Sequence, residues 1–333
     1  MGKYLILACA IGATTRGLAA AQSFEMNAGL AAHLQSVDFR IVAGRIEATS
    51  QQFGGHTTST AKGEDRQETL SVNCTAARPS VQYQLLSYDV EVTLQIVDGN
   101  QLLIRRQPKS GSEAVAVEFS QQPGHPLVLT LGGGLEAQAY RAPTLWHLLL
   151  AYPETCEREL LPWLDMLRPD WRLAETAAQI EDSLYRAARR QTVPDRARWT
   201  QLVAELAAVE FSRRQAADRM LRSAGQAVLP FLERLDPEQL DAEQRFRIRR
   251  MIASLTGSTS AERPQQIAVR MAGDCRVWVS LLSRPDAARR RLATEQLGRL
   301  FGEPIDFDPQ ADDATRSKQM ERLRVRCEMP AGE

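Results

Sequence analysis

The spacing of hydrophobic residues along the chain changes near residue 141, and this change predicts two structural parts. Between residues 37 and 140, apolar and polar positions alternate and turn-forming residues separate the runs, as in half-buried β-strands. The clearest run covers residues 89–97, in which the apolar positions share one face: Val90, Val92, Leu94 and Ile96. Asp98-Gly99 then predicts a tight turn, so residues 101–105 should return beside this strand as a β-hairpin.

Further strands are expected at residues 39–49, 69–76, 81–87, 114–119 and 127–131. Residues 51–68 are rich in Gly, Thr, Ser and charged residues, and they predict a loop or a mobile hairpin tip. No helical segment lies between the strands, so they should pair as an antiparallel sheet. The expected N-terminal fold is therefore an antiparallel β-sandwich or an open barrel.

From Pro143 to about residue 326 the hydrophobic period becomes helical. One apolar stripe recurs at helical spacing: Trp199, Leu202, Val203, Leu206 and Val209. We therefore predict an α+β protein with a β-rich domain at residues 22–141 and an α-helical domain at residues 142–327. Residues 328–333 are expected to form a disordered tail.

The helical part contains two internal correspondences. Residues 160–170 align without gaps on residues 228–238, at an offset of 68, and both segments contain Leu-Pro-aromatic-Leu. A weaker correspondence, at an offset of 76, matches four positions in the segment 210–221 with four positions in the segment 286–297. The first set is Glu210, Arg214, Ala217 and Leu221, and the second is Asp286, Arg290, Ala293 and Leu297. Such self-similarity indicates repeated helical units that stack on one another.

At these residues the chain resembles HEAT or armadillo-like helical repeats. The similar features are an acid followed by Arg and Ala on a first helix, Gly225 between helices, and residues 227–232 at the start of a second helix. The resemblance covers roughly residues 145–300, and its units are longer than the usual period of about 40–47 residues. It implies an irregular HEAT-like domain, either compact or an open solenoid. The whole arrangement resembles bacterial cell-envelope proteins with such repeats, a likeness that brings no known activity with it.

The first 21 residues have the layout of a secretory signal peptide: Lys3, an apolar run of ten residues, and a small-residue stretch ending at Ala21. The run is too short for a transmembrane helix, so no stable membrane span is expected after its removal. Its removal also removes Cys9 and leaves four cysteines: Cys74, Cys156, Cys275 and Cys327. An exported chain permits disulfides. We expect one between Cys275 and Cys327, and buried reduced thiols are the alternative.

Composition and motifs predict no catalytic, cofactor-binding or metal-binding residues. The chain of 333 residues has 41 basic and 41 acidic residues, so an electrostatic attraction to nucleic acid is not expected. Its four histidines lie outside zinc-binding spacings, and neither a nucleophile elbow nor a phosphate-binding loop is present. The four aspartates between residues 306 and 313 lack the Gly and Glu of an EF-hand and should cap a helix instead.

Arginines cluster at residues 245–250 and 289–291. Three of them follow an acid by four residues and predict ordinary helical ion pairs: Asp241–Arg245, Glu243–Arg247 and Asp286–Arg290. Arg249 and Arg250 have no such local acid, so they are candidates for contact with an anionic partner.

Together these features predict an exported, non-enzymatic protein-interaction or structural module, either periplasmic or extracellular. Its expected partner is another envelope protein, bound on the helical repeats. Two other classes stay open: the β-domain binds a small molecule, peptide or glycan, or the chain is an enzyme with dispersed catalytic residues.

Overall fold

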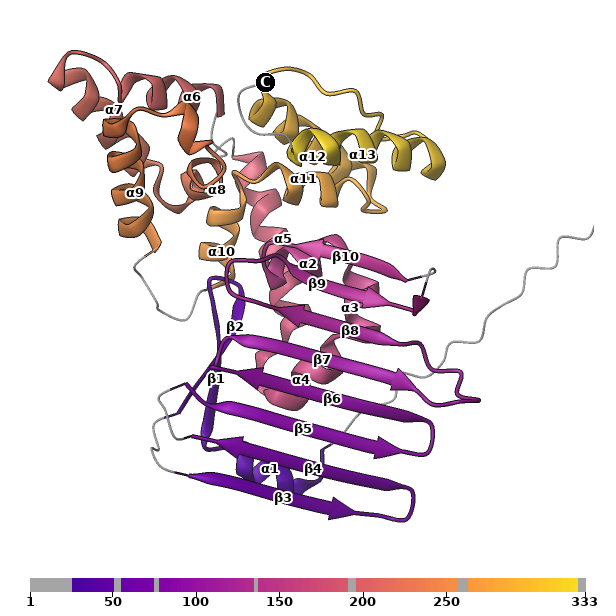
Figure 1. Cartoon of the computed structure of the whole chain (residues 1–333). Coiled ribbons are helices and arrows are strands. Elements are labelled where there is room, and N and C mark those ends of the chain that lie inside the picture. Colours follow the sequence, from indigo (N-terminus) through magenta and orange to yellow (C-terminus); the bar gives the residue numbers. More distant parts are fainter. Residues whose placement is uncertain are drawn as a thin grey trace, which may run out of the picture.

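The computed structural model describes residues 26–50, 55–74, 78–134, 137–190, 196–256 and 263–328 (Figure 1). It confirms the α+β class, with an antiparallel sheet in the N-terminal half and helices in the C-terminal half. The predicted signal peptide and residues 329–333 of the predicted tail lie outside the described residues, and the last helix ends at Glu328. Within the described ranges, none of the helices has the length and apolarity needed to cross a membrane.

Eight strands form one antiparallel sheet whose spatial order follows the chain, from β3 at one edge to β10 at the other. The strands are β3 (His56–Lys62), β4 (Arg66–Asn73), β5 (Ser80–Ser87), β6 (Val90–Val97), β7 (Gln101–Pro108), β8 (Val117–Gln121), β9 (Leu127–Leu131) and β10 (Gln138–Ala142). The predicted hairpin is β6 with β7, and its register places Leu94 opposite Ile104. Asp98 and Gly99 both have positive φ, which is the backbone that a two-residue hairpin turn requires.

Two predicted segments differ from the structure. Residues 39–49 form two strands, β1 (Val37–Val42) and β2 (Arg45–Ser50), because Ala43-Gly44 turns the chain with positive φ at both residues. Residues 51–68, predicted as a loop or hairpin tip, contain β3 and the start of β4. β3 is an edge strand whose side chains are mostly exposed, so it lacks the apolar alternation that marks a half-buried strand.

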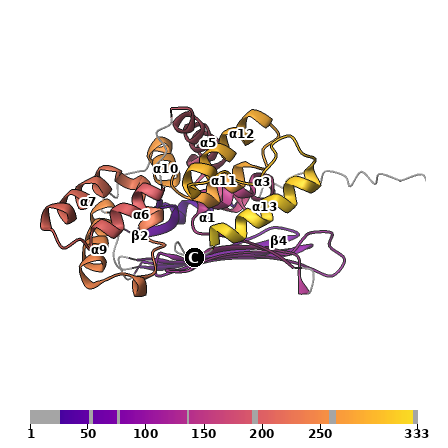
Figure 2. The ribbon, with the colours of Figure 1, turned by 90° about the horizontal axis from the view of Figure 1, so that it is seen from above.

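The layer that covers the sheet also differs from the expected sandwich or open barrel. The described strands form an open sheet, in which β3 and β10 are opposite edges. Figure 2 shows this sheet edge-on, with the helices on one side of it. Helix α1 (Ala28–Leu34) contacts β3 and β4, and α2 (Leu145–Ala151) contacts β10. These helices and the separate two-stranded sheet β1–β2 share the core on the apolar face of the large sheet, so no second large sheet is needed to cover it.

The remaining helices continue to the end of the described chain. They are α3 (Pro153–Glu159), α4 (Leu161–Leu167), α5 (Leu173–Arg189), α6 (Arg196–Glu205), α7 (Phe211–Ser223), α8 (Leu229–Leu232), α9 (Ala242–Thr256), α10 (Pro264–Met271), α11 (Cys275–Leu281), α12 (Ala287–Phe301) and α13 (Asp313–Glu328). Strand gives way to helix between Ala142 and Leu145, at the predicted boundary.

The hydrophobic core crosses this boundary. One continuous core contains the covered face of the sheet together with side chains of α2–α5 and α10–α13. Arg106 of β7 adds an ion pair with buried Glu159 of α3, with nitrogen and oxygen 2.6 Å apart. A second core belongs to α6–α9 (residues 196–256), which we call the α6–α9 lobe and which stands at the upper left of Figure 1. The sheet and most helices therefore share one core, and the lobe has its own.

The first internal correspondence aligns equivalent elements. Residues 160–170 contain α4 and a 3₁₀ turn, η2 (Pro169–Trp171), followed by α5. Residues 228–238 contain α8 and η4 (Pro237–Gln239), followed by α9. Trp163 and Phe231, at matching positions, are both buried. No repeat architecture follows from this order of elements alone, and the HEAT-like resemblance stays a prediction.

Candidate functional site

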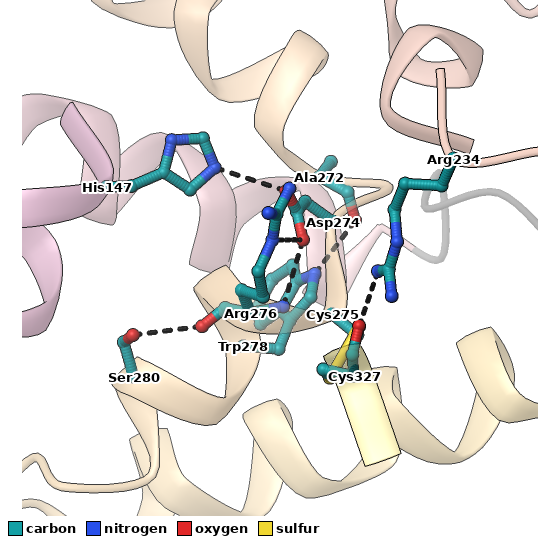
Figure 3. Close-up of a disulfide and its surroundings, with 9 residues drawn as sticks. All are labelled: His147, Arg234, Ala272, Asp274, Cys275, Arg276, Trp278, Ser280 and Cys327. Atoms are coloured by element: carbon teal, nitrogen blue, oxygen red, sulfur yellow. Dashed lines mark hydrogen bonds and ion pairs between the residues drawn. A yellow bond between two sulfur atoms is a disulfide. The ribbon is translucent and has the colours of Figure 1, made fainter. Parts of the chain in front are cut away.

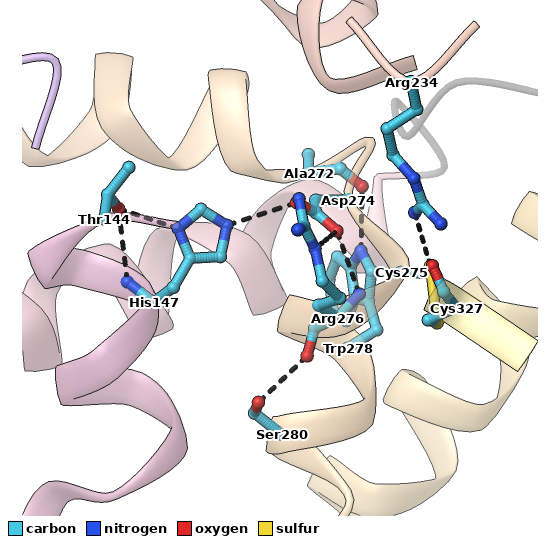
Figure 4. Close-up of polar contacts among 10 residues, drawn as sticks. All are labelled: Thr144, His147, Arg234, Ala272, Asp274, Cys275, Arg276, Trp278, Ser280 and Cys327. Carbon is cyan, nitrogen blue, oxygen red and sulfur yellow. Dashed lines mark hydrogen bonds and ion pairs between the residues drawn. A yellow bond between two sulfur atoms is a disulfide. The ribbon is translucent and has the colours of Figure 1, made fainter. Parts of the chain in front are cut away.

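A connected group of polar side chains in the helical half begins at the start of α2. Thr144 caps this helix, and its Oγ1 accepts a bond from the backbone N–H of His147. The same oxygen lies 2.7 Å from Nδ1 of the His147 ring (Figure 4). Gly44, in the β1–β2 turn, packs against Thr144 so closely that a Cβ there would lie 2.7 Å from the threonine Cβ. The threonine hydroxyl is therefore packed beside this turn and already bonded.

The other ring nitrogen of His147 faces Asp274, with Nε2 and Oδ2 3.3 Å apart. Asp274 is the N-cap of α11, its side chain is 1% exposed, and it receives a forked contact from the Arg276 guanidinium. Burial raises the pKa of this carboxyl, but hydrogen bonds from His147 and Arg276 outweigh burial and hold its pKa well below the usual range. Asp274 is thus a stable buried anion that joins α2 to α11.

A hydroxyl, an imidazole and a carboxylate in series are also the parts of a nucleophilic relay. Here, however, the Thr144 hydroxyl caps its own helix and lies beneath the Gly44 turn. A nucleophile must instead reach a substrate carbon that sits beside an oxyanion site. The geometry therefore favours a structural connection between two helices.

The structure brings the two predicted disulfide residues together. Cys275 lies at the start of α11 and Cys327 in α13, with Cα atoms 5.9 Å apart, and the two sulfurs are joined (Figure 3). Nη1 of Arg234, from the α6–α9 lobe, donates to the Cys275 sulfur at 3.2 Å. Cys74 and Cys156 are buried free thiols, and burial raises the pKa of Cys156 to about 12. The pair thus fastens the last helix to α11.

Arg249 and Arg250 lie on the exposed side of α9, as a partner-binding role requires. The Arg250 guanidinium stacks over the ring of Phe246, 5.7 Å from its centroid, and Phe246 is 54% exposed. Arg249 donates only to the carbonyl of Arg245, one turn back. In the described part of the chain, neither arginine has an acidic side chain within ion-pair distance. We call Phe246, Arg249 and Arg250 the α9 patch.

Phe246 was not among the predicted site residues, because an aromatic residue in a helix is usually part of the core. The signal in the sequence was its position within the arginine cluster. Of the eight large apolar side chains exposed in the described residues, four belong to the α6–α9 lobe: Val209, Phe211, Met220 and Phe246. Val209 was predicted as part of a buried stripe, but α6 ends at Glu205 and Val209 is 97% exposed.

The predicted arginine pairs are partly wrong. Glu243 and Arg247 form the expected ion pair at 2.6 Å. Arg245 instead donates to the carbonyl of Pro237. Arg290 donates to backbone carbonyls, among them that of Pro309, while Asp286 accepts from the backbone of Ala288. Both guanidinium groups therefore satisfy backbone carbonyls instead of pairing with the acid four residues before them.

Of the four aspartates between residues 306 and 313, Asp308 and Asp312 accept bonds from the local backbone, and the other two form ion pairs with Arg322 and Arg316. Asp312 accepts from the N–H of Thr315 in the first turn of α13, as predicted for a cap. In the described residues, no group of three or more His, Cys, Asp or Glu side chains is placed to hold a metal ion. When the chain is compared with protein-family models, curated proteins and solved structures, none of the three comparisons finds a match.

Proposed function

We propose that this protein is an exported, non-enzymatic interaction module whose α6–α9 lobe binds an acidic surface of another envelope protein. The observation that carries the proposal is the α9 patch, in which an exposed aromatic ring lies beneath one unpaired guanidinium and beside another. Aromatic and arginine side chains dominate the binding energy of protein interfaces. A carboxylate that binds Arg250 would also place its aliphatic part on the Phe246 ring.

The composition of the lobe supports an acidic partner. Residues 196–256 contain eleven arginines and eight acidic residues, a net charge of +3, whereas the whole chain is neutral. Four large apolar side chains are also exposed in the lobe, and exposed apolar side chains are common at protein-binding sites. The lobe therefore combines exposed apolar side chains with an excess of positive charge, which is the complement of an acidic protein surface.

Export is supported by two independent features. Residues 1–21 have the layout of a signal peptide. The Cys275–Cys327 pair is of the kind that persists in oxidising compartments such as the periplasm.

Charge reversal on the full chain tests the proposal. The protein with Arg249→Glu and Arg250→Glu would be immobilised beside wild type and beside a control with Arg141→Glu and Arg291→Glu, two exposed arginines outside the lobe. Envelope proteins retained by each would be quantified by mass spectrometry. We expect an acidic protein that wild type and control retain and the α9 variant loses. Equal retention by all three proteins would reject the α9 patch as the binding surface.

A further inference from the structure

A cleft of about 560 Å³ lies between α3 and α5, outside the α6–α9 lobe. The end of α2, the start of α3, α4, one side of α5 and the loop after α11 line it. This volume is within the range of about 300–1,000 Å³ that is usual for ligand sites. The cleft shares no residue with the α9 patch, so what it binds is independent of the proposed function.

The cleft has an apolar floor. Leu149 of α2, Leu161 of α4 and Ala177 of α5 are buried and lie at its base. Ala174 and Ala178, one helical turn apart on α5, are exposed along its wall. Because alanine side chains are small, a chain in the cleft can approach the α5 backbone closely. The floor thus offers room and apolar contact for aliphatic side chains.

The charged side chains at the cleft are mostly acidic. Glu154 and Glu157, one turn apart on α3, are exposed at its rim, and neither has an ion pair among the described residues. Glu181, on the opposite wall, is buried and binds Arg284 at 2.7 Å. Nη2 of Arg284 donates also to the carbonyl of Leu150 at 2.9 Å, so this guanidinium is already satisfied by the wall. Glu181 also pairs with Arg289 at 3.0 Å, so the negative charge open to a ligand is that of Glu154 and Glu157.

One backbone carbonyl adds an acceptor at the same place. Pro153 follows the end of α2 and has no N–H, so the carbonyl of Leu149 lacks the donor that the next helical turn would supply. An ammonium or guanidinium group carries only donors, several of them on one centre. The negative charge of the rim therefore selects a cation.

We propose that this cleft binds an extended peptide segment in which a lysine or arginine is flanked by aliphatic residues. The aliphatic side chains lie on the floor formed by Leu149, Leu161 and Ala177, and the basic side chain reaches Glu154 and Glu157 at the rim. The negative charge of the rim selects a positively charged side chain, and the apolar floor selects aliphatic residues on either side of it. A lining with this charge disfavours an acidic segment of the same size.

Isothermal titration of the full chain with three short peptides tests the ligand class. The probes are acetyl-Leu-Lys-Leu-amide and the same peptide with Gln or Glu in place of Lys. We expect the lysine peptide to bind about tenfold or more tightly than the glutamine peptide, which corresponds to about 1.4 kcal/mol, and the glutamate peptide to bind least. Equal binding of the lysine and glutamine peptides, or binding by none of the three, would overturn the proposal.

Variants of the wall place the binding in the cleft. Ala178→Phe fills it from α5, whereas Gln179→Phe adds the same bulk one residue along the helix, outside the lining. Glu154→Gln with Glu157→Gln removes the rim charge, and Glu64→Gln with Glu238→Gln is the matched exposed control. The two cleft variants should lose the lysine peptide and the two controls should keep it. Unchanged affinity in both cleft variants would refute the site, even if the peptide binds elsewhere.

Discussion

Arg214 of α7 and Arg290 of α12 make the same pair of backbone hydrogen bonds, in segments 76 residues apart. Nη1 of each arginine donates to the carbonyls of the residues six and five positions before it. The distances are 2.7 and 2.7 Å for Arg214, and 2.6 and 2.7 Å for Arg290. Each arginine follows an acidic N-cap residue by four positions, Glu210 in α7 and Asp286 in α12. The arginine thus binds the turn that leads into its own helix.

Removing this arginine should destabilise the shared core. Arg290 is buried and satisfies the carbonyls of Arg284, Pro285 and Pro309. We expect Arg290→Ala to lower the free energy of unfolding by about 2–3 kcal/mol, because three part-buried carbonyls would lose a charged donor. Arg291→Ala, the exposed neighbouring residue, should change it by less than about 0.5 kcal/mol. Urea denaturation measures both, and equal effects of the two substitutions would show that the bonds of Arg290 do not matter.

The two aligned aromatic residues should each support a core of their own. Trp163 packs in the core shared with the sheet, and Phe231 packs in the α6–α9 lobe beside Trp199. Trp163→Ala and Phe231→Ala should each cost about 3–5 kcal/mol through the cavity that remains. Arg249→Ala and Arg250→Ala should each stay within about 0.5 kcal/mol, since both side chains are exposed. Unchanged melting of the aromatic variants would mean that the aligned segments are not packing units.

Local pattern was enough to predict the strands with one buried face and the turn between them. The β6–β7 hairpin follows from alternating apolar residues and Asp98-Gly99, all within 20 residues of chain. The edge strand β3 carries no such alternation, because neither of its faces is well covered. The Ala43-Gly44 turn lacked the Asn or Asp that usually marks a hairpin, and β1 and β2 were read as one strand.

Contacts between distant segments account for what sequence pattern did not predict. His147 and Asp274 are 127 residues apart, and no spacing rule links them. The shared core was missed because helical periodicity shows that one face of a helix is buried, but not that a sheet covers it. The weaker correspondence at offset 76 includes equivalent hydrogen bonds. Sequence pattern did not predict these bonds, because their acceptors are backbone carbonyls, which every residue has.

The Asp274 anion should contribute a stability that depends on pH. Its pKa is depressed in the folded protein, so its contribution is complete above the unfolded value of about 3.9 and is lost as the pH falls below it. At pH 7, Asp274→Asn should lower the free energy of unfolding by about 2–3 kcal/mol, because the contacts with His147 and Arg276 lose their charge.

A second N-cap supplies the matched control. Asp286→Asn alters an exposed cap of α12, and asparagine caps a helix as well as aspartate does, so its effect should be small. Denaturation of the three proteins between pH 3 and pH 7 measures the difference. The deficit of Asp274→Asn relative to wild type should shrink as the pH falls through about 4 and below. A deficit that is constant over this range would contradict the role of the charge.

The Cys275–Cys327 disulfide should stabilise the chain by restricting its unfolded state. The two residues are 52 positions apart, for which the chain-entropy model gives about 4 kcal/mol. Peptide mapping without reductant should recover the two cysteines in one linked species. A reductant should lower the stability of wild type and leave the variant with Cys275→Ala and Cys327→Ala unaffected. A free thiol at either position in the native protein would exclude the pair.

Photo-crosslinking from the α9 patch tests the proposed interaction most directly. A benzoylphenylalanine placed at position 246, in the full chain and in the producing cell, would react only with what touches that face of α9. The same group at position 88, an exposed tyrosine on the β5–β6 turn, is the control. The proposal predicts one major adduct from position 246, with an acidic envelope protein, that is absent from position 88 and disappears with Arg249→Glu and Arg250→Glu. No adduct from position 246, or the same adducts from both positions, would contradict the claim that the α6–α9 lobe is a binding surface.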